Sequence, residues 1–297
     1  MAFVDGSTGE ISLQATGAVA RRQALSRASR YVLLAATLVG VGVLLYLGYE
    51  TIDRGGSRLS IDFLTSYPSR FAERAGLRSS LIGWFWVLGL TVILAIPIAI
   101  GTAIWMEEFA PRNRVLTLVK LNLANLAGVP SIIYGILGLA LFVRFMDLGP
   151  SILAGSLTLA LMILPMTVIA SQEAIRQVPP SIRHGALALG ATRWQMVWNH
   201  VLPGAMPGIM TGMILAVSRA AGETAALIMI GAFTFIAYDN TRPTEDFTTV
   251  PVQIYNWTIR PQEAFRQNAA AAIIVLMVFV LTLNLIAAVI RERFRSE

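Results

Sequence analysis

An arginine and a glutamate stand inside an apolar stretch of this 297-residue chain, in the run Arg219-Ala-Ala-Gly222-Glu223-Thr224. The two charges are four positions apart, so a continuous helix would place both on one face. A charge within an apolar membrane segment is costly unless it faces protein or water. A guanidinium also suits the geometry of an oxyanion. The pattern favours a charged site on a substrate path, and the alternative is a structural ion pair that locks helices together.

Small residues surround these charges in a regular pattern. Gly222 weakens a helix beside Glu223, which predicts a break or a re-entrant turn near the middle of the membrane. The small residues recur every four positions, and such a stripe lets another helix approach closely. It fits either packing within the chain or a dimer interface along a pore axis. The stripe consists of Gly204, Gly208, Gly212, Ala216 and Ala220.

A second run, Gly128-Val-Pro-Ser131-Ile-Ile-Tyr134-Gly135, contains a proline that can start a helix. We expect Pro130 to be the first helical residue, with Ser131 in the first turn. The free N–H groups of a helix that starts near mid-bilayer attract anions. We therefore predict that Ser131 and Tyr134 join the charged run, including Thr224, on the substrate path; an ordinary entry turn of a span is the alternative.

Most signatures of enzymes are missing from the sequence. The single lysine, Lys120, is followed by leucine, so the chain has no P-loop for a nucleotide. The two histidines, His184 and His200, have no glutamate at metalloprotease spacing, and there are no cysteines. We expect a protein that is not an enzyme and that binds no metal or cofactor of its own.

Composition defines the class of protein. Hydrophobic residues make up 56% of the chain and charged residues 13%, whereas soluble domains carry about 25% charged residues. Several apolar runs reach the ~20 residues needed to cross a bilayer. We predict an all-α polytopic membrane protein, with the segment 114–127 as a possible interfacial helix. The six expected spans are 31–49, 81–106, 126–145, 151–170, 205–232 and 268–290.

The charges indicate an orientation. The net charge is +6, and the arginines lie in short loops, which argues for retention of those loops in the cytoplasm rather than for nucleic-acid binding. The excess of basic over acidic residues on one side of the membrane predicts that both termini lie in the cytoplasm. Residues 1–30 then form a polar cytoplasmic segment whose first ~20 residues we expect to be poorly ordered.

The polar interval 171–203 lies between two apolar runs and would face the cytoplasm. Between Ile182 and His200 it has no proline, and apolar positions recur at helical spacing. We therefore predict one helix over about 182–200. Such a helix on one face of a membrane protein offers a docking surface to a partner.

This interval resembles the coupling loop of binding-protein-dependent ABC transporter permeases. Their pattern is Glu-Ala-Ala, a glycine four residues later, and a closing hydrophobic residue with proline. The two glycine-containing runs described above look like motifs of the phosphate-specific branch, and Val250–Trp257 is similar to its PstA family. The matching coupling residues are His184, Gly185, Ala186, Gly190, Ala191, Leu202 and Pro203.

The resemblance implies a MetI-like permease domain over residues 81–297, preceded at 31–80 by a first transmembrane helix and an external segment. It implies half of the pore of an ATP-driven phosphate importer in a bacterial inner membrane. The implied partners are a PstC-like permease, two PstB-like ATPases that bind ATP and Mg²⁺, and a PstS-like periplasmic phosphate-binding protein. The alternatives are a permease for molybdate, sulfate or phosphonate, an ATP-independent carrier, and an intramembrane enzyme.

Overall fold

The computed structural model describes residues 17–232 and 235–295, and it divides into two units at Asp53–Arg54. The first unit is formed by helix α1 (Ala18–Gly55), which contains the predicted span 31–49. The prediction that the first residues are poorly ordered falls mainly on residues 1–16, which lie outside the described residues.

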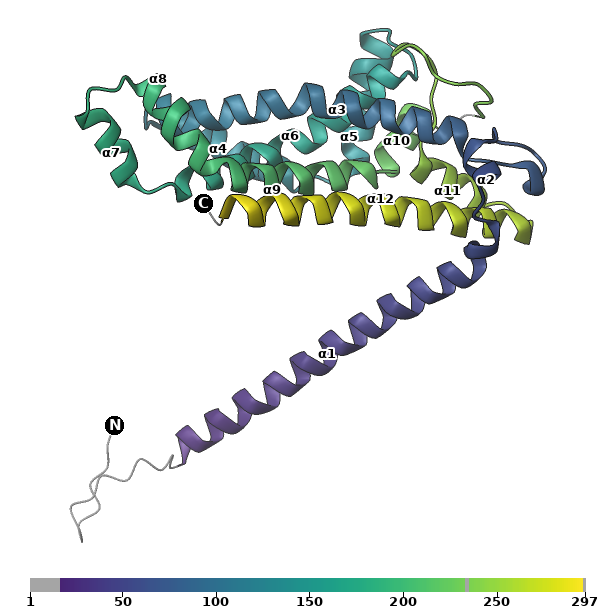
Figure 1. The fold of residues 1–297 in the computed structure, drawn as a ribbon, viewed down its shortest axis with the longest axis horizontal. Coiled ribbons are helices and arrows are strands. Elements are labelled where there is room, and N and C mark those ends of the chain that lie inside the picture. Colours follow the sequence, from purple (N-terminus) through teal and green to yellow (C-terminus); the bar gives the residue numbers. More distant parts are fainter. Residues whose placement is uncertain (1–16, 233–234, 296–297) are drawn as a thin grey trace. The chain divides into compact units, whose positions relative to one another are not determined.

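Four long helices form the frame of the second unit, because their apolar runs are long enough to cross a membrane. Helix α3 packs against α6, α6 against α9, and α9 against α12, and Figure 1 shows them running alongside one another. Together with α1 they make five candidate spans. The four are α3 (Arg78–Ile104), α6 (Ile152–Gln177), α9 (Leu202–Ala221) and α12 (Glu263–Arg295).

The sixth candidate span is a bent pair. Helix α4 (Arg114–Ala127) and the helical stretch from α5 (Ser131–Gly138) through the π-helical turn η4 (Leu139–Phe145) meet at an angle of 101°. Helix α4 packs along α6, and the pair is either a broken span or a re-entrant loop. The expected count of six agrees with the structure when this pair is counted as one span.

Short elements lie at the two ends of the bundle (Figure 1). One end, which we call the α7 end, also receives the last residues of α12. It holds η3 (Trp105–Phe109), α7 (Pro180–Ala188), α8 (Arg193–Met196) and η5 (Val197–Val201). The other, the α11 end, holds η1 (Gly56–Arg58), α2 (Ile61–Thr65), η2 (Ala72–Arg74) and α11 (Val250–Thr258).

The stripe of small residues packs within the chain. A Cβ atom added to Gly208 would lie 2.6 Å from the Cβ of Ala174, and one added to Gly212 would lie 2.6 Å from the Cβ of Ala170. Both alanines belong to α6, and close approach of this kind is what small residues permit in membrane helices. Helix α6 therefore occupies the face that a dimer interface would have needed, and that alternative is wrong for these glycines.

Candidate functional site

The predicted helix break at Gly222 is confirmed. Helix α9 ends at Ala221, and the short helix α10 begins at Ala225 and ends at Ile230. The indole N–H of Trp84 donates to the carbonyl oxygen of Ala221 at 3.0 Å. This bond satisfies one of the carbonyl groups that a helix end leaves free.

Glu223 does not share a helical face with Arg219, so that prediction is wrong. The helix has already ended at Gly222, and Oε1 of Glu223 accepts a hydrogen bond of 3.1 Å from the backbone N–H of Ala226. The carboxylate thereby satisfies a free donor at the start of α10, where a negative charge is favoured.

Arg219 is left without an acidic partner. Its side chain is exposed in the last turn of α9, where Nη1 lies 3.6 Å from Sδ of Met166. Within residues 17–232 and 235–295, no ion pair includes Arg219. An exposed guanidinium on a helix apolar enough to cross a membrane must face water or another protein chain. The arrangement leaves all of its donors except one available for an anion.

A second break lies at the corner between α4 and α5. Pro130 precedes the helix instead of opening it, one residue from the predicted start, and Ser131 is the first helical residue. Tyr134 is buried, and its hydroxyl donates to the carbonyl oxygen of Leu126 at 2.8 Å. This bond joins α5 to the last turn of α4 and holds the corner.

The two breaks lie next to each other because α5 packs against α10. A Cβ atom added to Gly135 would lie 2.7 Å from Cα of Ala226, so only glycine allows this approach. The structure thus brings together the two runs that the sequence singled out separately, although the role of each residue on a substrate path stays a prediction.

The interval predicted as one helix over 182–200 is two helices, so that prediction is wrong. Gly190 has a φ of +87°, a conformation that side chains with a Cβ disfavour, and it ends α7. The N–H of Ala191 donates to the carbonyl oxygen of Ala186 at 3.1 Å, which closes the turn. Thr192 and Gln195 then form a capping box that starts α8.

Helix α7 presents an apolar surface with no acidic side chain. His184, Gly185 and Leu187 are exposed, and Leu189 in the following turn is 91% exposed. Ala186 is buried against the bundle. Contiguous exposed apolar side chains of this kind indicate an interaction surface. The remaining predicted coupling residues lie in the turn, at Gly190 and Ala191, and at the start of α9, at Leu202 and Pro203.

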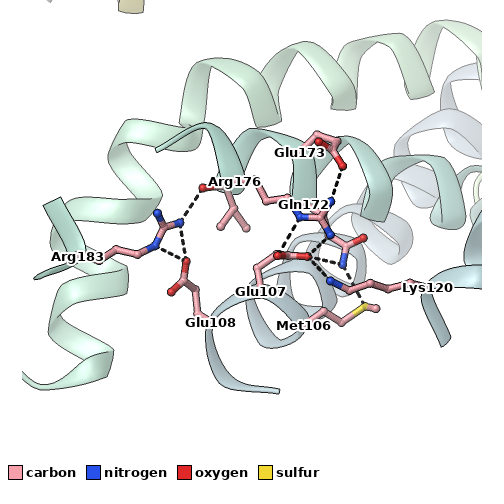
Figure 2. A network of polar contacts seen from close by, with 9 residues as sticks. Met106, Glu107, Glu108, Lys120, Gln172, Glu173, Arg176 and Arg183 are labelled. Carbon is pink, nitrogen blue, oxygen red and sulfur yellow. Dashed lines mark hydrogen bonds and ion pairs between the residues drawn. The ribbon is translucent and has the colours of Figure 1, made fainter. Parts of the chain in front are cut away.

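Two consecutive glutamates that the sequence analysis did not single out connect this surface to the bundle (Figure 2). Oε1 of Glu108 accepts hydrogen bonds from Nε and Nη2 of Arg183, at 3.0 and 2.8 Å. The same guanidinium donates to the carbonyl oxygens of Ile175, at 2.8 Å, and of Val178. Arg183 therefore joins α7 both to η3 and to the end of α6.

Glu107 makes a second set of bonds from the same turn (Figure 2). It accepts from Nζ of Lys120 at 2.8 Å, from Nη2 of Arg176 at 2.9 Å and from Nε2 of Gln172 at 3.1 Å. These contacts tie the end of α3 to α4 and α6. The partners are 13 to 69 residues away in sequence, which is why the glutamate pair by itself gave no signal of its role.

In the described part of the chain, no three histidine, aspartate or glutamate side chains lie together as a metal site requires. His184 and His200 are exposed on α7 and η5.

Comparison with known families agrees with this architecture. Residues 95–296 match the family of binding-protein-dependent transport system inner membrane components. This match covers more than half of the chain, and the chain therefore belongs to that family of ABC transporter permease subunits. The protein is a multi-pass integral membrane protein with the fold of ABC importer permeases.

Individual relatives cover most of the chain. It is 34% identical over 265 residues to the probable ABC transporter permease protein YqgI of Bacillus subtilis, which covers 84% of this chain and 88% of that protein. It is 30% identical over 251 residues to the phosphate transport system permease protein PstA of Haemophilus influenzae, with the same coverages.

Solved structures share the fold at low sequence identity. A chain of a bacterial alginate ABC transporter, in complex with an alginate-bound periplasmic protein, matches with a TM-score of 0.62 at 17% identity. The match covers 90% of this chain and 94% of that chain. A chain of the MetNI methionine ABC transporter matches with a TM-score of 0.57 at 16% identity, over 71% of this chain and 94% of that chain.

Proposed function

We propose that this chain forms half of the translocation pore of an ATP-driven importer of inorganic phosphate. The observation that carries the proposal is the exposed, unpaired guanidinium of Arg219, placed on an apolar helix beside two helix breaks. Broken helices that supply free backbone groups and a fixed charge are a common way to bind an ion within a membrane. Phosphate is proposed rather than another oxyanion because relatives of this chain are described as phosphate transport permeases.

The proposed setting is a bacterial inner membrane with both termini and the α7 end in the cytoplasm. The balance of arginines between the loops supports this orientation. The last residues of α12 lie at the α7 end, which agrees with a cytoplasmic C-terminus next to the proposed docking surface.

The partners follow from what the chain presents. A PstC-like permease would cover Arg219 and complete the pore, because a charge in a membrane needs protein or water around it. Two PstB-like ATPases would bind ATP and Mg²⁺, with one of them receiving the exposed α7 and Leu189. A PstS-like binding protein would deliver phosphate at the α11 end.

The mechanism we propose is alternating access. Closure of the ATPase pair displaces α7, and the displacement moves the bundle helices between inward-open and outward-open arrangements. Arg219 balances the charge of phosphate as it passes the breaks. Glu223 holds the start of α10 through Ala226 and so keeps the break between α9 and α10 in position.

The substrate is tested by reconstituting this chain with its three partner proteins in vesicles and measuring uptake of labelled phosphate. We expect ATP-dependent uptake that excess unlabelled phosphate competes away and that molybdate, sulfate and phosphonate leave unchanged. Equal competition by one of those anions would assign the pore to that anion instead. Uptake by this chain alone, without the ATPase, would identify a secondary carrier.

Docking is tested through a single introduced thiol, because the chain has no cysteine. Leu189→Cys places the thiol on the proposed docking surface, and Ile61→Cys places it at the opposite end of the bundle, where the side chain is also exposed. We expect the ATPase to protect position 189 from a maleimide and to leave position 61 reactive. Equal labelling of position 189 with and without the ATPase would refute docking at α7.

A further inference from the structure

We infer that the ion pair between Arg183 and Glu108 is the joint that carries the movement of α7 into the pore helices. The inference rests on the proposed function and assigns two positioning residues for coupling. It depends on how α7 is attached to the bundle, on what lies beyond the attachment, and on the burial of the two charges.

Helix α7 is short and has a non-helical corner at each end. Val178 and Pro179 are extended, with ψ angles of 124° and 137°, and Gly190 has a positive φ at the other end. The backbone alone therefore transmits little force in a fixed direction. A side-chain contact that bridges a corner is needed for the bundle to follow α7.

Arg183 bridges the first of these corners. Its guanidinium holds Glu108 with two N–H donors and reaches two carbonyl oxygens at the end of α6, those of Ile175 and Val178. A planar guanidinium held by several charge-assisted bonds has a defined orientation as well as strength. Displacement of α7 must therefore either break these bonds or move η3 and the end of α6 with it.

Burial favours movement over breakage. The side chain of Glu108 is 7% exposed and that of Arg183 is 19% exposed. Removing one partner of such a pair leaves a charge with little access to water, which is costly. The joint is therefore more resistant to separation than an ion pair on the surface.

The neighbouring Glu107 extends the connection to more of the bundle. It lies in the same π-helical turn as Glu108 and holds Lys120 of α4 and both Gln172 and Arg176 of α6. Helix α4 leads directly to the corner at Pro130, which Tyr134 fastens through Leu126. One glutamate thus receives the movement of α7, and the adjacent one distributes it toward the breaks beside Arg219.

The test measures phosphate transported per ATP hydrolysed in the reconstituted complex. Glu108→Gln keeps the size of the side chain and an acceptor oxygen, and Arg183→Lys keeps the positive charge but loses the planar donors. We expect each variant to lower the ratio about threefold to thirtyfold while Leu189→Cys remains protected by the ATPase. Because both changes act on one contact, the double variant should lower the ratio no further than the stronger single variant.

The matched control is Glu173→Gln, which makes the same chemical change in an exposed carboxylate on the rim of the cluster. Its ratio should equal that of the unaltered chain. A normal ratio in both Glu108→Gln and Arg183→Lys, with docking intact, would overturn the joint and leave the proposed function standing. Additive losses in the double variant would overturn it as well. Equal labelling of position 189 with and without the ATPase in the otherwise unaltered chain would instead refute docking at α7, the part of the proposed function on which the joint rests.

Discussion

Two sets of charged side chains in this protein differ in whether the chain itself supplies a charged partner. At the α7 end, Glu107 and Glu108 are largely buried and each binds at least one cation (Figure 2). In the second group, Arg219 lies exposed on α9 with Met166 as its polar contact and with no acidic partner in the described residues. Pairing satisfies the first group within the chain. The second has no charged partner among the described residues, and this is why we propose it, rather than the first, as a site for an anion.

The largest expected effect separates binding from stability at Arg219. Replacing Arg219 with glutamine removes a charged hydrogen bond to the anion, worth about 1.5–3 kcal/mol. Uptake at low phosphate should therefore fall roughly tenfold to hundredfold. The thermal midpoint of the purified chain should stay unchanged, because no acid loses its partner.

Arg219→Lys serves as the control for charge without the planar donors, and it should retain part of the uptake. Undiminished uptake in Arg219→Gln would show that the exposed guanidinium is not a substrate site. A large loss of stability in that variant would place Arg219 among the structural charges and remove the contrast.

At Glu107 we expect the opposite result, a loss of stability. Glu107→Gln leaves Lys120 without a carboxylate and leaves Arg176 with only the exposed Glu173. Since both cations are partly exposed, the cost should be about 1–2 kcal/mol of unfolding free energy. Thermal unfolding in detergent measures it. Glu173→Gln, which loses only an exposed pair, should cost less than about 0.5 kcal/mol. Equal stability of the two variants would mean that the cluster does not hold the helices together.

The sequence drew attention to Arg219 but not to the paired glutamates Glu107 and Glu108, and the reason is physical. Arg219 stands out because an apolar run surrounds it, and Gly222 signals the break directly. The contacts of Glu223 depend on where α9 ends, so its spacing of four positions from Arg219 wrongly predicted a shared helical face. The partners of Glu108 lie up to 75 residues away, and only the fold brings them together.

The docking surface shows the same limit. Helical periodicity continued across Gly190, and so it predicted one helix over 182–200. The local signals for two helices were present, in a glycine followed by the capping-box residues Thr192 and Gln195. Capping chemistry outweighed hydrophobic periodicity here, because the positive φ of Gly190 turns the chain before the next helix begins.

A third prediction tests whether the two helix breaks form one site around Arg219. Gly135→Ala would place a methyl group 2.7 Å from Cα of Ala226, which forces α5 and α10 apart at a cost of about 1–3 kcal/mol. We expect lower uptake together with a lower thermal midpoint. Gly89→Ala is the control, since a Cβ there meets nothing within 4 Å. Normal uptake in Gly135→Ala would mean that the contact between the breaks does not position the site.

The smallest expected change in stability concerns an exposed ion pair near the α11 end. It tests how little an ion pair contributes when its side chains are not buried. Nε of Arg78 donates to Oδ1 of Asp239 at 2.9 Å, and this hydrogen bond lowers the pKa of the Asp239 carboxyl below its ordinary value. A lowered pKa in the folded state contributes stability above the ordinary pKa, and that stability is lost as the pH falls through the folded value. Because both side chains are well exposed, solvent screens the pair. Asp239→Asn should therefore lower the thermal midpoint at neutral pH by less than Gly135→Ala does. The difference from the unaltered chain should shrink as the pH falls below the ordinary carboxyl pKa and vanish only below the lowered pKa of the folded state. A difference that persists in acid would show that the side chain acts through packing rather than through its charge.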